Sequence, residues 1–259
     1  MSYYRQGPFR PPGSGVTIGI PPVTPSLRLI MIVCGAVWLV QILLGFTGFH
    51  VGNLSFEGIF GVVPALVIRG FVWQLATYMF LHSPDSIMHI LFNLMFIWMF
   101  GGELERHWGS RGFLRYYLVC GVGGGVFIVA MGMANALLGA APASAYTPTI
   151  GASGALFGLI VAYGMMFAER RVLFMLVFPM KASTFSMLMF AIAFFFTFAG
   201  EGGNISHIGH VGGAVVGFLY LKRAWRLGEF YRELRWKLRR RRFRVTPRDD
   251  RDDFDRWVN

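Results

Sequence analysis

The chain has 259 residues, of which 55% are hydrophobic and only 14% are charged. A soluble domain of this length carries about 25% charged residues, so the composition excludes an ordinary water-soluble globular protein and favours one that crosses a membrane several times. Both cysteines, Cys34 and Cys120, lie inside apolar segments, where a lone cysteine behaves as a small hydrophobic residue. They give no indication of a disulfide framework or of the redox compartment.

The N-terminal arm, residues 1–27, is rich in proline, glycine and serine and lacks the apolar core of a signal peptide. We expect this arm to be disordered and to remain on the cytoplasmic side. The rest of the chain divides into a membrane domain at 28–225 and a basic tail at 226–259.

Six apolar segments are candidates for spanning a bilayer, which requires about 20 mostly apolar residues. In chain order they are residues 29–49, 87–100, 113–138, 150–167, 184–199 and 205–225. A further apolar stretch at 172–183 is interrupted by Pro179 and Lys181, and we expect it to be an interfacial connector. The sequence therefore predicts an all-α membrane protein built from six transmembrane helices.

The orientation of these spans follows from their lysine and arginine residues, which accumulate in cytoplasmic loops. Basic residues precede the first span, lie between the second and third and between the fourth and fifth, and follow the sixth; the opposite loops contain only Arg69. Both termini are therefore expected in the cytoplasm, a topology that fits a bacterial inner membrane.

The C-terminal region is the most basic part of the chain: residues 222–259 hold 14 of the 24 lysines and arginines. The run KLRRRRFR at 237–244 allows two interpretations, a nucleic-acid patch or a topology anchor that contacts anionic lipids. Because the tail directly follows a span, we favour the lipid contact and expect no nucleic-acid partner.

Polar side chains recur at one depth of the second, fourth and sixth spans, which run in the same direction. Near the outer starts of these spans lie His89 and Asn93, Ser153, and His207 and His210, respectively. At 1.5 Å per residue each lies on the order of 5 Å below the outer surface. One such residue is explained by helix packing, but ionisable groups in a membrane are costly, so the whole set favours a reactive site.

Glycines repeat at every fourth residue close to these groups, as Gly154 and Gly158 in the fourth span and Gly209, Gly213 and Gly217 in the sixth. Small residues at this spacing let membrane helices approach closely. If the fourth and sixth spans pack along these glycines, Ser153 and His210 come within hydrogen-bond reach.

A serine beside a histidine forms a dyad for nucleophilic catalysis, with the histidine as general base and then general acid. The oxyanion would be stabilised by the Ser153 N–H, His89 and the Asn93 amide. No acidic residue lies at this depth, and Phe157, one turn below Ser153, is placed to pack against the ring of His210.

Other chemistries fit less well. In GASGA the fifth position is Ala155, so a nucleophile elbow is not supported, and no HExxH motif is present. His207 and His210 form a possible metal site with His82 or His89, but no carboxylate or thiolate joins them, and we expect no metal.

Four motifs then match a known family: HILFN at 89–93, LERHWGS at 104–110, GASGALFG at 151–158 and HVGGAVVG at 210–217. With these motifs in this order, residues 28–225 resemble the rhomboid intramembrane serine proteases. The resemblance implies a six-helix bundle with a long interfacial first loop at about 50–86. It also implies a water-filled cavity, substrates that are transmembrane proteins, and no cofactor.

The resemblance further implies the roles of individual residues. Ser153 is the nucleophile and His210 the base, His89 and Asn93 stabilise the oxyanion, and Gly151 allows the tight turn before Ser153. Gly213 and Gly217 support the close packing of the sixth span.

One departure from the family pattern is Gln74, which follows Trp73 where arginine is common, and it puts an anchor of the first loop in doubt. The alternatives are a catalytically inactive relative that binds membrane-protein clients and a cofactor-binding or transport protein. Because both Ser153 and His210 are retained, we favour the active protease.

Overall fold

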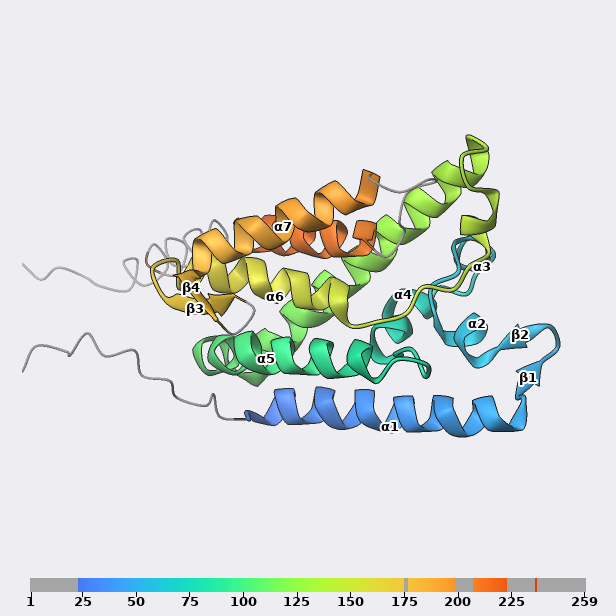
Figure 1. Ribbon diagram of the computed structural model, residues 1–259, viewed down its shortest axis with the longest axis horizontal. Coiled ribbons are helices and arrows are strands. Elements are labelled where there is room, and N and C mark those ends of the chain that lie inside the picture. Colours follow the sequence, from blue (N-terminus) through green and yellow to red (C-terminus); the bar gives the residue numbers. More distant parts are fainter. Residues whose placement is uncertain (1–22, 175–176, 199–206, 223–235, 237–259) are drawn as a thin grey trace, which may run out of the picture.

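The computed structural model describes residues 23–174, 177–198 and 207–222, together with residue 236. Figure 1 shows that these residues form mostly helices that lie roughly along one long axis, with two short hairpins. The basic tail predicted at 226–259 lies outside the described residues except for Trp236, and so do residues 1–22 of the N-terminal arm.

The first helix, α1, extends over Pro25–Thr47. Proline suits this first position because it has no N–H to leave unpaired. The helix ends at Gly48, whose φ of 64° is left-handed and whose N–H bonds back to Gly45 and Leu44. It therefore begins inside the arm predicted at 1–27, so the predicted boundary is a few residues too late.

The chain between α1 and the next long helix contains six short elements. They are β1 (His50–Val51), β2 (Leu54–Ser55), α2 (Phe56–Phe60), α3 (Pro64–Val67), α4 (Gln74–Thr77) and the 3-10 helix η1 (Tyr78–Phe80). Strands β1 and β2 pair antiparallel. This segment is thus folded along most of its length.

Gln74 is the centre of this folded segment and is completely buried. Its amide nitrogen donates to the carbonyl of Gly58 at 2.8 Å, and its amide oxygen accepts from the N–H of Val63 at 3.0 Å. Gln74 therefore anchors this loop, which the departure from the family pattern had put in doubt, because a neutral amide both donates and accepts and so joins two stretches of backbone.

Helix α5 extends over Ile87–Leu137 but is interrupted at Gly109, where φ is 72° and ψ is 163°. Glycine adopts this conformation without the steric penalty that other residues carry. The chain consequently turns there, and α5 consists of a first arm (87–108) and a second arm (110–137), as Figure 1 shows. The spans predicted at 87–100 and 113–138 fall on these arms to within one residue, and the residues between them are helical except at Gly109.

The remaining elements are α6 (Ser153–Met166), strands β3 (Arg171–Phe174) and β4 (Phe178–Lys181), and α7 (Ala182–Phe198). Residues 207–222 form a further helix, so residues 205–206 and 223–225 of the predicted sixth span lie outside the described residues. Between α5 and α6 lies a second 3-10 helix, η2 (Pro142–Ala145). The connector expected at 172–183 contains all of the antiparallel pair β3–β4 except Arg171. The strands were not predicted, because the apolar run has no two-residue alternation.

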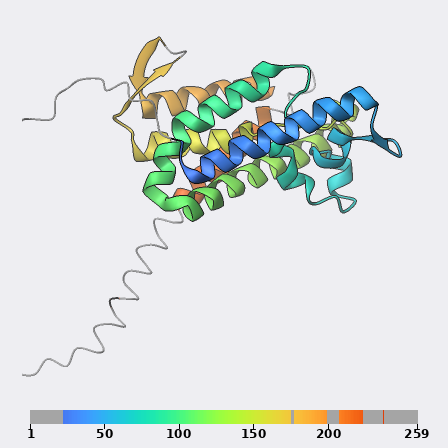
Figure 2. The same ribbon diagram turned by 90° about the horizontal axis from the view of Figure 1, so that it is seen from below.

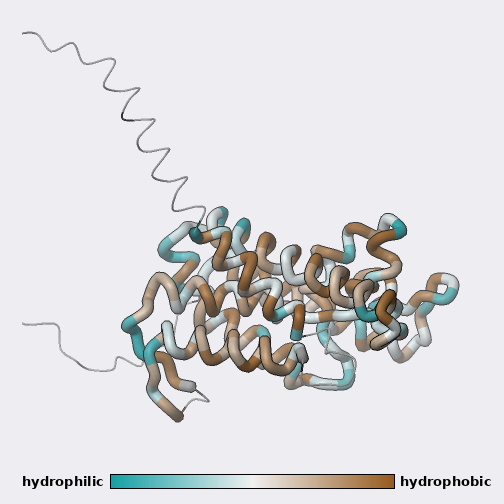
Figure 3. The backbone as a smooth tube through the Cα atoms, turned by 90° about the horizontal axis from the view of Figure 1, so that it is seen from above, coloured by the Kyte–Doolittle hydropathy of each residue, from teal (hydrophilic) through white to brown (hydrophobic). Residues whose placement is uncertain are grey.

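Helices α1 and α5 are long and apolar enough to cross a membrane, whereas α6 and the apolar part of α7, Ala182–Thr197, are shorter apolar helices. Large apolar side chains are exposed on the sides of the bundle, among them Ile32, Phe46, Leu118, Met187 and Phe195. In Figure 3 apolar residues follow the helices, while hydrophilic residues gather mainly at turns and ends. Such a surface suits a protein whose sides face hydrocarbon.

Candidate active site

Helix α6 begins at Ser153, in the middle of the molecule along its long axis (Figure 1). Its 14 residues give a length of about 21 Å, less than the hydrocarbon core of about 30 Å. The span predicted at 150–167 is therefore too long at its start. Ser153 is therefore the first helical residue rather than one within the helix.

The chain that leads into α6 is held by backbone hydrogen bonds. Val62 and Thr149 form an isolated antiparallel bridge, and the N–H of Gly151 donates to the carbonyl of Tyr78 at 3.0 Å. The first loop thus supports the turn that presents Ser153.

Gly151 occupies this turn with a φ of 128°, which side-chain-bearing residues rarely adopt. A Cβ at this position would lie 2.8 Å from Nε2 of His89. Both the conformation and the close approach therefore require glycine, and the glycine lets the His89 ring lie directly against the turn.

The structure brings Ser153 and His210 together: Nε2 of His210 lies 2.7 Å from Oγ of Ser153. Residues 207–222 supply the histidine and α6 supplies the serine. The ring of Phe157 stacks on the imidazole, with the ring centroids 4.4 Å apart and the planes at 3°. The stacked ring limits the imidazole to one plane, in which Nε2 faces the hydroxyl.

Glycines make this approach possible, because two helices meet there without side chains between them. A Cβ at Gly213 would overlap the backbone of Gly154, and one at Gly217 would overlap the hydroxyl of Tyr116. A Cβ at Gly158 would overlap the side chain of Cys120 on the second arm of α5. The helix at 207–222 therefore packs against α6 backbone to backbone.

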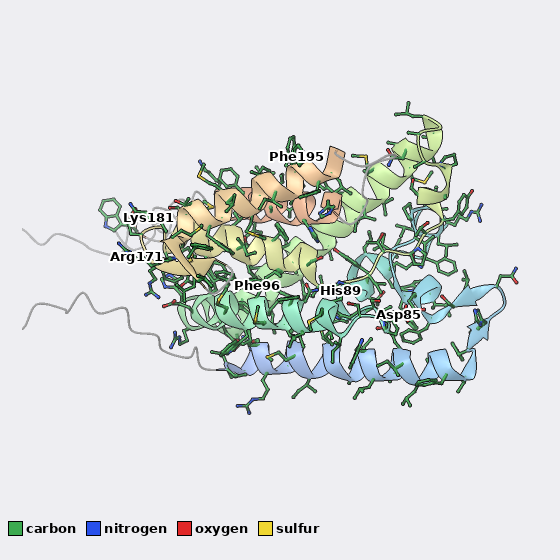
Figure 4. The ribbon with its side chains drawn as sticks, viewed as in Figure 1. Asp85, His89, Phe96, Arg171, Lys181 and Phe195 are labelled. Atoms are coloured by element: carbon green, nitrogen blue, oxygen red, sulfur yellow. The ribbon has the colours of Figure 1, made fainter. Side chains whose placement is uncertain are left out.

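His89 lies on the first turn of α5 beside this dyad, and Figure 4 shows it in the middle of the molecule. The backbone N–H of Ser83 donates to its Nδ1 at 3.2 Å. A neutral imidazole that accepts at Nδ1 carries its proton on Nε2, which is the nitrogen that faces Gly151. The ring thus presents a donor to the turn before Ser153.

Asn93 lies one turn further along α5 and is buried. Its amide nitrogen donates to the carbonyl of His89 at 2.8 Å, while its Oδ1 has no hydrogen-bond partner among the described residues. An amide nitrogen has two hydrogens, so one donor remains after this bond.

Two residues of α1 that were not predicted as functional hold the loop that orients His89. The side-chain oxygen of Gln41 accepts from the N–H of His82 at 3.0 Å, and the Trp38 indole donates to the carbonyl of Ser83 at 3.0 Å. Gln41 is buried in an apolar helix, and a polar residue in such a helix was the one available signal.

A groove of about 410 Å³ contains the dyad together with His89 and Asn93. Apolar side chains of three helices complete it, among them Phe92 and Phe96 of α5, Leu156 of α6 and Met189 of α7. The groove therefore combines a polar reactive end with apolar walls.

His82 and His207 lie near the site but outside the dyad. His82 is fully buried, with its ring 5.2 Å from that of His89, and burial lowers its pKa to about 4. The His207 ring lies edge-on to His210 at 5.4 Å. Among the described residues no group of three or more histidine, cysteine or acidic side chains is arranged to hold a metal ion.

Comparison with known proteins gives consistent matches. The family model described as "Rhomboid domain" matches residues 69–226. Rhomboid protease GluP of Bacillus subtilis is 32% identical over 154 residues, which cover 60% of this chain and 26% of GluP. Rhomboid protein 1, mitochondrial, of Saccharomyces cerevisiae is 26% identical over 141 residues, which cover 53% of this chain and 38% of that protein.

Rhomboid protease GlpG of Yersinia pseudotuberculosis is 30% identical over 148 residues, which cover 57% of this chain and 46% of GlpG. The chain thus aligns with less than half of the length of each of these three relatives. The matched stretch of the Rhomboid domain contains His89, Asn93, Ser153 and His210, the four residues described above.

Proposed function

Since the chain belongs to the rhomboid family of integral membrane proteins, we propose that it is an intramembrane serine endopeptidase with Ser153 as nucleophile and His210 as general base. The observation that carries the proposal is the 2.7 Å contact between Ser153 Oγ and His210 Nε2. It lies in a groove with room for a peptide segment, and its two residues are those that a serine–histidine dyad requires.

In the first step the Ser153 oxygen attacks the carbonyl carbon of the scissile peptide bond, and its proton passes to His210 Nε2. The stacked Phe157 keeps the imidazole in the plane of this transfer. A tetrahedral intermediate forms, with negative charge on the former carbonyl oxygen.

Three donors would stabilise that oxygen. They are the Ser153 N–H, which has no acceptor within α6 because it belongs to the first turn, His89 Nε2–H and the remaining amide hydrogen of Asn93. Donors fixed in an apolar surrounding stabilise developing charge strongly, each by about 3 kcal/mol in well-studied cases.

The intermediate collapses when the carbon–nitrogen bond breaks and His210 gives its proton to the leaving amine. The acyl group stays on the Ser153 oxygen. Water then attacks the acyl carbon while His210 Nε2 takes its proton, and the proton returns to Ser153 as the acid product leaves. The cycle requires water in the groove but no cofactor.

We further propose six transmembrane segments: α1, the two arms of α5, α6, α7 and the helix at 207–222. The distribution of lysine and arginine favours cytoplasmic termini and a bacterial inner membrane. The substrates would be transmembrane or membrane-proximal segments of other proteins, since only these reach a recessed serine from the bilayer. The basic tail would contact anionic lipids.

The first test is covalent labelling of the purified full-length protein with a fluorescent fluorophosphonate probe. We expect labelling of the wild type and none of Ser153→Ala or His210→Ala, with all variants folded by gel filtration and circular dichroism. Ser86→Ala is the matched control, because Ser86 lines the same groove and its labelling should stay at the wild-type level.

The outcomes separate the interpretations of the site. Labelling that persists in Ser153→Ala identifies another serine as the nucleophile. A folded wild type that neither labels nor cleaves a reconstituted single-span substrate supports the inactive, client-binding relative instead.

A further inference from the structure

The hairpin of strands β3 and β4 exposes large apolar side chains at one end of the molecule. Val177 is 66% exposed, Phe178 60% and Leu173 36%. A two-stranded hairpin is marginally stable by itself in water, and clustered exposed apolar residues mark an interaction surface. The proposed function assigns no role to this surface.

The two faces of the hairpin differ. Val172 is buried, and it is paired with the half-buried Met180 on the face toward the bundle. Because side chains alternate along a strand, Leu173 and Pro179, which are also paired, belong to the outer face. By the same alternation Phe178 belongs to the face of Val172 and Met180, yet it is largely exposed. Both faces of the hairpin therefore carry exposed apolar side chains.

Basic residues occupy the base of the same outer face. Arg171 is paired with Lys181 in the register of the two strands, and both are exposed. Lys181 forms an ion pair with Glu169 at 2.8 Å, and Arg170 forms one with Glu103. Arg171 makes no ion pair with any described residue, so a cation remains available at the base.

The hairpin also points in an unusual direction for a loop at the end of a helical bundle. Figure 2 shows it projecting from the side of the bundle at one end. Figure 4 places Arg171 and Lys181 at the same end. In a protein whose helices cross the bilayer, a sideways projection at this end runs along the membrane surface.

We propose that the β3–β4 hairpin is an interfacial membrane anchor. Its apolar tip enters the boundary between headgroups and acyl chains of the adjacent leaflet, and the basic base contacts the phosphates of anionic lipids. An apolar tip with a cationic base matches the polarity gradient of that boundary. The proposal depends on the membrane location of the bundle and not on the reaction at Ser153.

The test places a fluorescent label at the hairpin of the full-length protein. Cys34 and Cys120 are completely buried, so Val177→Cys is the selective site for an environment-sensitive maleimide. Arg111→Cys is the matched control, because Arg111 is exposed and lies two residues after the Gly109 break of α5. Figure 1 shows the bend of α5 at the same end of the bundle as β3 and β4. Each cysteine substitution is made in the Ser153→Ala variant, and each labelled protein is reconstituted in phosphatidylcholine vesicles with and without phosphatidylglycerol.

We expect blue-shifted emission at position 177 and quenching by a shallow nitroxide lipid about two-fold or more above that at position 111. Added phosphatidylglycerol should increase this quenching, and Arg171→Gln should remove the increase. Equal quenching at both positions overturns the proposal, and so does a disulfide-linked dimer through position 177, which assigns the surface to a second copy. Neither readout involves catalysis, so an inactive protein leaves the test intact.

Discussion

The carboxylate of Glu105 and the polar groups around Ser153 both lie inside an apolar bundle, but they differ in how completely they are hydrogen-bonded. Glu105 is buried and accepts hydrogen bonds from Thr24, from the backbone N–H groups of Ser26 and Leu27 at 2.9 and 3.1 Å, and from Ser110 at 2.6 Å. It thereby caps α1 and ties that helix to the bend of α5.

Around Ser153 some polar atoms remain unpaired. Asn93 Oδ1 and His207 Nδ1 are buried without a partner among the described residues, although buried polar groups are nearly always paired. Glu105, which holds the fold together, therefore has its hydrogen bonds satisfied, whereas Asn93 in the groove keeps an unpaired oxygen available to the proposed substrate.

The largest effect is expected from removing the dyad. Ser153→Ala or His210→Ala should lower the rate of cleavage of a reconstituted transmembrane substrate by about 10³-fold or more, because nucleophile and base act as one unit. The double variant should be no slower than either single one. A multiplicative loss in the double variant would contradict a dyad.

The next largest effect is expected from Gly151→Ala, which should lower the cleavage rate by about 10²-fold. The added Cβ opposes the φ of 128° and displaces His89 Nε2, so the oxyanion donors no longer converge. Gly139→Ala is the matched control, since Gly139 also has a positive φ but no neighbour within 4 Å of its Cβ. Equal losses in both variants would assign the effect to backbone strain alone.

Glu105→Ala tests the other half of the comparison. It should lower the free energy of unfolding by about 3 kcal/mol, because it leaves several buried donors unpaired, while folded protein keeps its cleavage rate. Denaturation in mild detergent measures the free energy of unfolding, and single-turnover cleavage measures the rate. Glu103→Gln, at a partly exposed carboxylate, should cost less than about 1 kcal/mol.

Gln41→Leu should reduce the cleavage rate about ten-fold by loosening the loop that holds His89 in its Nε2–H form. The predicted loss is in kcat, with KM little changed, because the loop orients a donor used in the transition state. A change confined to KM would place Gln41 in substrate binding instead.

His207→Ala should have the smallest effect, within about three-fold of the wild-type rate, because its ring contacts His210 edge-on and the partner of the Ser153 hydroxyl is His210. Steady-state cleavage measures it. A loss as large as that of His210→Ala would make His207 part of the proton transfer.

Local sequence patterns were sufficient for part of this structure. The four-residue glycine spacing and the positions of Ser153, Phe157 and His210 on their helices predict which faces meet, since helical periodicity is a local property. The membrane class and the approximate helix positions follow in the same way from runs of apolar residues. The four rhomboid motifs then indicate the family.

What only the tertiary structure decided are contacts between distant parts of the chain. Gln74, Gln41 and Glu105 bond to backbone or side chains that lie 11 to 81 residues away, and no local pattern specifies such partners. The start of α6 depends likewise on the turn held by Tyr78, and the hairpin depends on strand pairing. Sequence determined which side chains were available for chemistry, and tertiary packing determined their distances, because hydrogen-bond geometry across the bundle depends on all the helices at once.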